Sequence, residues 1–151
     1  DLTSCYPCPQ GRVCGTQMMY NLSSSAACPQ GYICGFSTDL TRQFMHPSPA
    51  GFWTPEQTVP GGQFDNLCDP GFFCEKGTSE SDRNRARCPI GSFCPESTPS
   101  HFSGEIRCPK RTTTLSGASV LESCRINAVH VCDKLDIDVR KPMEDITFFS
   151  C

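Results

Sequence analysis

Cysteines are the residues of this chain with the clearest potential for chemistry, and there are 13 of them among 151 residues. Eight form pairs six residues apart, each pair enclosing a proline and a glycine: Cys8/Cys14, Cys28/Cys34, Cys68/Cys74 and Cys88/Cys94. Proline fixes φ near −65° and glycine accepts a positive φ, so each short loop can turn tightly. The turn brings its two thiols together, and we expect disulfide bonds.

Metal binding is the other common use of such residues. Cys5 and Cys8 have the spacing of a zinc-ligand pair, but a second pair of that spacing is missing. Asp133, Asp136 and Asp138 are hard oxygen ligands suited to calcium, but their spacing fits no calcium-loop motif. We therefore expect no metal ion and no other cofactor.

Catalytic motifs are not evident. The histidines His46, His101 and His130 lie in separate segments, and none stands at a known catalytic spacing from Ser, Asp or Cys. We predict that the protein is not an enzyme. The net charge is −3 with signs interspersed, which gives no electrostatic support for nucleic-acid binding.

Composition indicates the compartment. Hydrophobic residues make up 37% even with the cysteines included, which is too little for a conventional core in a chain of this length. Thirteen thiols are typical of an oxidising environment. No apolar run is long enough for a membrane span, and the chain begins at Asp1 without a signal segment. We expect an extracellular or cell-surface location, and a mature secreted product or part of a larger one.

The sequence repeats every 20 residues. Six units, numbered 1 to 6, begin at residues 8, 28, 48, 68, 88 and 108 without an insertion or deletion between them. Positions within a unit are counted from its first residue, so that cysteines stand at positions 1 and 7 and glycine at position 4. Unit 3 has Ser48 and Thr54 in place of its cysteines, and unit 6 has Arg111 at position 4 and Thr114 at position 7.

The repeat predicts a small disulfide-rich fold, irregular and mostly β, arranged as an elongated tandem array over residues 1–124. Position 6 is apolar in five units, and we interpret these residues as the small core of each unit: Val13, Ile33, Trp53, Phe73 and Phe93. The spacers are polar and lack helical periodicity. Residues 125–151 contain short β-prone runs and are interpreted as a cap or the start of a further domain.

Two disulfide schemes fit the sequence. In the first, which we favour because unit 3 lost both cysteines together, the pairs are Cys8–Cys14, Cys28–Cys34, Cys68–Cys74, Cys88–Cys94, Cys108–Cys124 and Cys132–Cys151. In the second, bridges join neighbouring units, as in Cys14–Cys28 and Cys74–Cys88. Because 13 is odd, one cysteine lacks a partner within the chain. Cys5 is the candidate for an unpaired or intermolecular cysteine.

Residues 88–124 resemble a known family. The runs CPIGSFCPEST and CPKRTTTLSGASVLESC are similar to the ephrin-receptor-like, or GCC-type, cysteine-rich repeat. Cys108, Ser116, Gly117 and Cys124 match its pattern, whereas Arg111 replaces an expected glycine. Over residues 5–124 the units look like tandem arrays in large extracellular proteins of algae and other protists. The resemblance implies a modular extracellular protein, adhesive or filament-forming as in flagellar hairs (mastigonemes), without catalytic residues.

Several residues could carry modifications or contacts. Asn21-Leu22-Ser23 is an N-glycosylation sequon, and we expect a glycan on Asn21. Hydroxyl residues beside prolines are candidates for O-glycosylation, namely Ser48, Thr54, Ser97 and Thr98. Phe52, Trp53 and Phe64 belong to the unit without cysteines and are candidates for contact with a partner.

Together these features predict an extracellular structural protein. We expect a disulfide-bridged, glycosylated rod that associates with itself, or with other extracellular structural proteins, into a filament or surface coat. The alternative is a receptor-like ectodomain, a binding module for a protein or glycan ligand. Self-association separates the two, because a receptor fragment should stay monomeric and bind something else.

Overall fold

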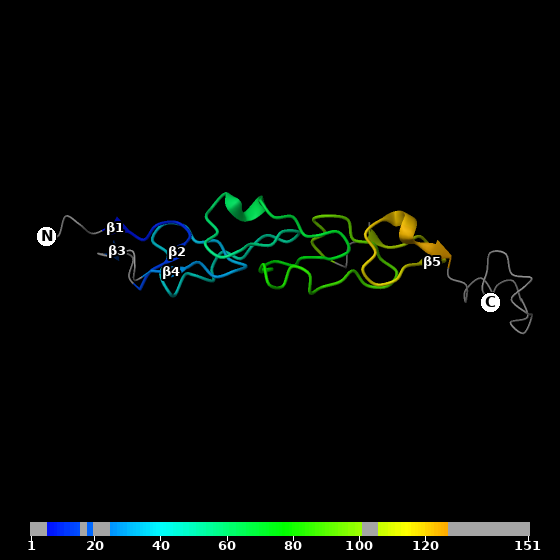
Figure 1. The fold of residues 1–151 in the computed structure, drawn as a ribbon, viewed down its shortest axis with the longest axis horizontal. Helices are drawn as coiled ribbons and strands as arrows, with labels where there is room; N and C mark the ends of the chain where they lie inside the picture. Colours follow the sequence, from blue (N-terminus) through cyan, green and yellow to red (C-terminus); the bar gives the residue numbers. More distant parts are fainter. Residues whose placement is uncertain (1–5, 16–17, 20–24, 101–105, 127–151) are drawn as a thin grey trace, which may run out of the picture.

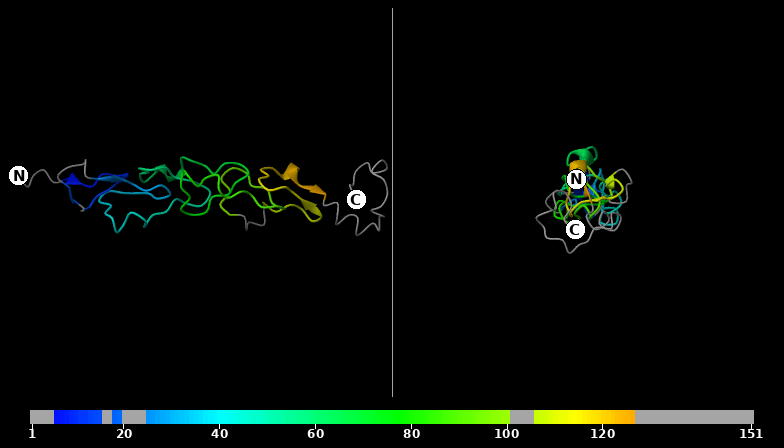
Figure 2. Two further views of the ribbon diagram at one scale, coloured as in Figure 1. Left: turned by 60° about the horizontal axis from the view of Figure 1, so that its bottom comes forward. Right: turned by 90° about the vertical axis from the view of Figure 1, so that its right-hand side faces the viewer.

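The computed structural model describes residues 6–15, 18–19, 25–100 and 106–126. These residues form an elongated rod along which the units follow one another in chain order (Figures 1 and 2). The predicted β-prone runs within residues 127–151 lie outside the described residues, as do Cys5, Asn21, Cys132, Cys151 and the three candidate calcium ligands.

Regular secondary structure is sparse and short. Among the described residues, three two-stranded antiparallel sheets pair β1 with β3, β2 with β4, and β5 with β6. The elements are β1 (Tyr6–Pro7), β2 (Arg12–Val13), β3 (Met18–Met19), β4 (Ala26–Ala27), the 3-10 helix η3 (Gly62–Phe64), β5 (Thr112–Thr113), the 3-10 helix η5 (Leu121–Ser123) and β6 (Arg125–Ile126). The predicted small, disulfide-rich, irregular and mostly β fold is confirmed.

Each unit closes on itself as a hairpin between positions 5 and 20. The antiparallel partners are Arg12↔Ala27, Tyr32↔Pro47, Phe52↔Leu67, Phe72↔Arg87 and Ser92↔Arg107. In unit 6 the partner of Thr112 is Ile126, at position 19. The chain of unit 6 therefore returns one residue earlier, and that unit departs from the others in its return strand as well as in its cysteine spacing.

Backbone hydrogen bonds join units 1 to 5 in a fixed pattern, whereas between units 5 and 6 the Gly91 amide donates to the Thr114 hydroxyl oxygen at 3.1 Å. The amide of Gly31, at position 4 of unit 2, donates to the carbonyl oxygen of Thr54, at position 7 of unit 3, at 3.0 Å. In return the Ser48 amide donates to the Gly31 carbonyl oxygen at 2.8 Å. The same pair of bonds forms around Gly11, Gly51 and Gly71. Because unit 3 takes part without a disulfide, the pattern depends on the backbone and not on the bridges.

Glycine at position 4 also lies against the unit after next. Gly31 has φ +82°, and a Cβ there would lie 2.5 Å from the carbonyl oxygen of Gly77 in unit 4. Equivalent approaches of 2.5–2.7 Å link Gly11 to Gln57, Gly51 to Ser97 and Gly71 to Gly117. A side chain at position 4 is therefore disfavoured for two reasons, because the backbone has a positive φ and because a Cβ would clash with the carbonyl oxygen of another unit. Arg111 of unit 6 takes the same conformation, with φ +69°.

The core consists mainly of disulfides. Eight half-cystines of units 1, 2, 4 and 5 have no exposed surface. Position 6 contributes as predicted at Val13, which is 2% exposed and packs with Cys28 and Cys34 of the next unit. Phe73 is only half-buried and packs against a cluster of Cys88, Cys94 and Ile106, again one unit further on. At Val13 and Phe73, position 6 therefore covers the bridge of the next unit rather than filling a core of its own unit.

Candidate interaction surface

Five disulfides lie in the described residues, and all follow the within-unit scheme. They are Cys8–Cys14, Cys28–Cys34, Cys68–Cys74, Cys88–Cys94 and Cys108–Cys124, with Cα–Cα distances of 5.7–5.9 Å. The scheme that bridges neighbouring units is not the one adopted by these cysteines. A set of disulfides this dense is typical of an extracellular or secreted protein. The predicted pairing of Cys132 with Cys151 and the role of Cys5 concern residues outside the described ranges.

In unit 3, hydroxyl residues occupy the places of the cysteines. Ser48 and Thr54 are fully buried. The Ser48 hydroxyl donates to the carbonyl oxygen of Thr78 at 3.1 Å, whereas the Thr54 Oγ1 is buried without a hydrogen-bond partner. A buried polar atom without a partner is destabilising. Unit 3 therefore lacks the disulfide of the neighbouring units and also contains a buried polar atom without a hydrogen bond.

Three of the candidate O-glycosylation sites are buried. Ser48 and Thr54 have no exposed surface and Thr98 is 4% exposed, which leaves no room for a sugar. The Thr98 hydroxyl donates to the Pro95 carbonyl oxygen at 2.6 Å. Burial in the folded rod disfavours glycans on these three residues, which belong to the repeat's interior, and their modification stays a prediction. Ser97 is half-buried, and its hydroxyl donates to the Gly51 carbonyl oxygen at 3.1 Å.

A column of threonines at position 11 was missed from the sequence. Each hydroxyl donates to the carbonyl oxygen three residues earlier, at 2.6–2.8 Å. The residues are Thr38, Thr58, Thr78 and Thr98, spaced 20 apart. Their backbone carbonyl oxygens accept from the position 7 amide of the preceding unit. The strict spacing was the signal that could have identified them as structural.

The three candidate contact residues form two separate arrangements. The rings of Phe52 and Phe64 meet edge to face, with centroids 5.2 Å apart. Tyr32 and Phe44 form the same pair one unit earlier, at 5.0 Å. Trp53 instead lies beneath the guanidinium of Arg83, whose Cζ is 4.8 Å from the centroid of the Trp53 ring. The indole nitrogen of Trp53 donates to the Leu67 carbonyl oxygen at 3.1 Å.

Exposed apolar side chains gather in the spacer of unit 2. Phe36, Leu40, Phe44 and Met45 are each 57–66% exposed, and Phe64 follows in the spacer of unit 3 at 56%. A groove of about 560 Å³ lies between the spacers of units 2 and 3, and its lining includes Ile33, Phe36, Arg42, Met45, Pro60 and Gln63. Phe36 and Met45 are the exposed apolar side chains of this set. Apolar side chains clustered around a groove are typical of an interaction site.

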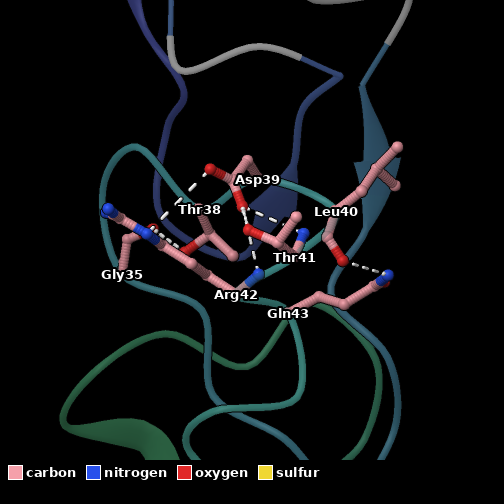
Figure 3. A network of polar contacts seen from close by, with 7 residues as sticks. All are labelled: Gly35, Thr38, Asp39, Leu40, Thr41, Arg42 and Gln43. Atoms are coloured by element: carbon pink, nitrogen blue, oxygen red, sulfur yellow. Dashed lines mark hydrogen bonds and ion pairs between the residues drawn. The ribbon is translucent and has the colours of Figure 1, made fainter.

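Polar contacts hold the wall of this groove in place (Figure 3). Asp39 accepts hydrogen bonds from the Thr41 hydroxyl at 2.6 Å and from the Thr41 and Arg42 amides at 3.0 Å. The Thr41 hydroxyl chiefly, then these amides and the charge of Arg42, lowers the pKa of Asp39. The Arg42 side chain is 56% exposed, and its Nε lies 4.0 Å from Asp39. Arg42 therefore keeps most of its capacity to bind a further carboxylate.

His46 lies on the groove wall, and among the described residues no group of three His, Cys, Asp or Glu side chains is placed to hold a metal ion. A search of the same residues finds no helix of the length and apolarity that crossing a bilayer requires.

Comparison with protein families, with curated proteins and with solved structures finds no match for this chain.

Proposed function

We propose that the chain is part of an extracellular structural protein, a disulfide-bridged and glycosylated rod that associates with itself into a filament or surface coat. The observation that carries the proposal is the recurrence of one set of backbone hydrogen bonds at successive junctions between units. Each unit contacts the next unit and the one after it along one axis, so the array can extend by adding units as other repeat proteins do. The resemblance to extracellular cysteine-rich arrays supports the same role.

The bridges favour a load-bearing or protective role outside the cell. Each disulfide closes a loop within one unit, so no bridge restricts how many units can follow one another. Loss of one bridge, as in unit 3, leaves the hydrogen bonds between units in place. An array built in this way can lose a bridge in one unit and still keep the hydrogen bonds that join its units. Such tolerance suits a structural component.

Exposed apolar surface supports association. The spacer of unit 2 presents several large apolar side chains to solvent, which costs free energy in an isolated rod. A receptor-like module would bury this surface against a different protein or a glycan. We favour self-association because the units already join through their own repeated surfaces.

Electron microscopy of the native, non-reduced protein tests the proposal. Regular filaments or a repeating lattice are the expected result. Dispersed single rods at high protein concentration would contradict self-assembly and favour the receptor-like role, which a screen for protein and glycan ligands would then address.

A further inference from the structure

The groove of unit 2 has a smaller counterpart in unit 3. Seven residues that line the unit 2 groove, between Gly35 and His46, have their register equivalents between Pro55 and Asn66 around a hollow in unit 3. The volumes differ, at about 560 Å³ in unit 2 and about 210 Å³ in unit 3. The larger groove has additional walls formed by Ile33, Pro60 and Gln63.

The two hollows differ in the residue at position 6, because Ile33 lines the larger one whereas Trp53 does not line the smaller one. The residues equivalent to Ile33 and Gln63 one unit later are Trp53 and Arg83, which stack on each other at 4.8 Å. An indole at position 6 fills space that the smaller isoleucine leaves open. The chain therefore carries its own example of the group that fits this groove: an aromatic ring.

An exposed aromatic ring beside a carboxylate lies next to the groove. Phe64 directly follows Gln63 in η3 and is 56% exposed, and Asp65 follows with an exposed carboxylate. Arg42, on the groove wall, offers a cation that within the described part of the chain is paired only with Asp39, at 4.0 Å. Arg42 and Asp65 are therefore exposed groups of opposite charge, and the Phe64 ring, which contacts Phe52 at one edge, leaves more than half of its surface free for the apolar lining of the groove.

We infer that this surface binds a second copy of the chain, with Phe64 of each copy entering the groove of the other and Asp65 facing Arg42. Ring and groove are neighbours in one molecule, so two copies can exchange the contact about a twofold axis. The contact would cover the apolar side chains of Phe36 and Met45, which are otherwise exposed. This inference rests on the proposed self-association, and it identifies the contact through which two copies would first associate.

Sedimentation analysis of the oxidised full chain, with free thiols alkylated, tests the inference over a wide concentration range. Wild-type protein should form a dimer. Ile33→Trp, which fills the groove as Trp53 does one unit later, should weaken dimerisation about tenfold or more. Ile90→Trp is the matched control, because Ile90 is 70% exposed at position 3 of unit 5, outside the groove. Native disulfide mass and circular dichroism establish that both variants fold.

Charge reversal tests the second half of the contact. Arg42→Glu and Asp65→Arg should each weaken the dimer, and the double variant should recover most of the loss because the pair is restored with opposite signs. Arg87→Glu and Glu96→Arg, at exposed positions of units 4 and 5, are the matched controls and should leave the dimer unchanged.

The outcomes separate this inference from the proposed function. A wild-type monomer throughout, a dimer that Ile33→Trp leaves intact, or no recovery in the double charge variant would overturn the inference. Electron microscopy of the same samples examines filaments independently. Filaments formed by Ile33→Trp would leave the structural role standing without this contact, whereas a groove-dependent dimer that never forms filaments would support the contact and contradict the filament.

Discussion

Gly31 lies against Gly77 so closely that a Cβ on residue 31 would be 2.5 Å from the Gly77 carbonyl oxygen. The two residues are 46 positions apart and belong to units 2 and 4. Direct contact therefore reaches beyond the adjacent unit, and the space for it is created by the absence of one side chain. Units in this rod interlock rather than merely stack.

Gly31→Ala should lower the free energy of unfolding by about 2 kcal/mol or more. The left-handed conformation alone costs an alanine about 1–2 kcal/mol, and the clash with backbone adds to it. Two controls separate these causes. Gly61→Ala also has a positive φ but open space around it, and Gly15→Ala meets nothing within 4 Å. Chemical denaturation should rank the losses as Gly31 above Gly61 above Gly15, and equal losses would contradict interlocking.

A bridge can be restored in unit 3. Ser48→Cys together with Thr54→Cys should form a disulfide, because the same positions in four other units are bridged at Cα–Cα distances of 5.7–5.9 Å. Closing a loop of this length should raise the free energy of unfolding by about 2 kcal/mol. Peptide mapping and denaturation, with and without reductant, provide the measurement. Each single cysteine variant is the control and should show no such gain.

The unpartnered hydroxyl of Thr54 predicts an unusual substitution. Thr54→Val keeps the shape and removes a buried polar atom without a hydrogen bond, so stability should stay unchanged or rise by about 1 kcal/mol. Thr58→Val is the matched control, because the Thr58 hydroxyl donates to the Pro55 carbonyl oxygen at 2.8 Å. Its loss should lower the free energy of unfolding by about 1 kcal/mol. Thermal denaturation compares the two, and equal losses would show that Thr54 has a partner.

Arg111 occupies a backbone conformation that glycine adopts in the other units. Arg111→Gly should raise the free energy of unfolding by about 0.5–1 kcal/mol, since relief of the left-handed conformation outweighs the greater freedom of glycine in the unfolded chain. Lys110→Gly, one residue earlier and without a positive φ, should instead lower stability by a similar amount. Denaturation of both variants decides the sign.

Glycosylation at Asn21 remains a prediction from the sequon. Protein isolated from its natural source should carry an N-linked glycan on the peptide that contains Asn21, detectable as a mass lost on enzymatic deglycosylation. Ser48 and Thr54 should be unmodified in the same digest because both are buried. Sugar on either residue would show that modification precedes folding.

The repeat made much of the local structure predictable. Its period placed the tight turns, the within-unit bridges and the rod correctly, because each depends on residues close together in the sequence. The contact of Gly31 with Gly77 could not be predicted, since it depends on how successive units are placed around the axis. The burial of Ser48 and Thr54 was not predicted, because serine and threonine beside proline are more often exposed, whereas here they take the buried places of cysteines.

The groove was likewise beyond prediction from the sequence. Phe52, Trp53 and Phe64 drew attention as aromatics in the unit without cysteines, but only the structure separates Trp53, stacked on Arg83, from the edge-to-face pair. The apolar residues of unit 2 are spread among polar ones in the sequence, and their common surface arises from the turns of the spacer.

The missing bridge of unit 3 has a mechanical consequence. When the rod is pulled from its ends, tension in a bridged unit crosses from the first cysteine to the second through sulfur, and the enclosed residues carry no load. In unit 3 the load passes through the whole stretch from Ser48 to Thr54, which can lengthen by about 15 Å when it is drawn straight. Among the turns of the described array, the turn of unit 3 is therefore the one that force can draw open without breaking a disulfide.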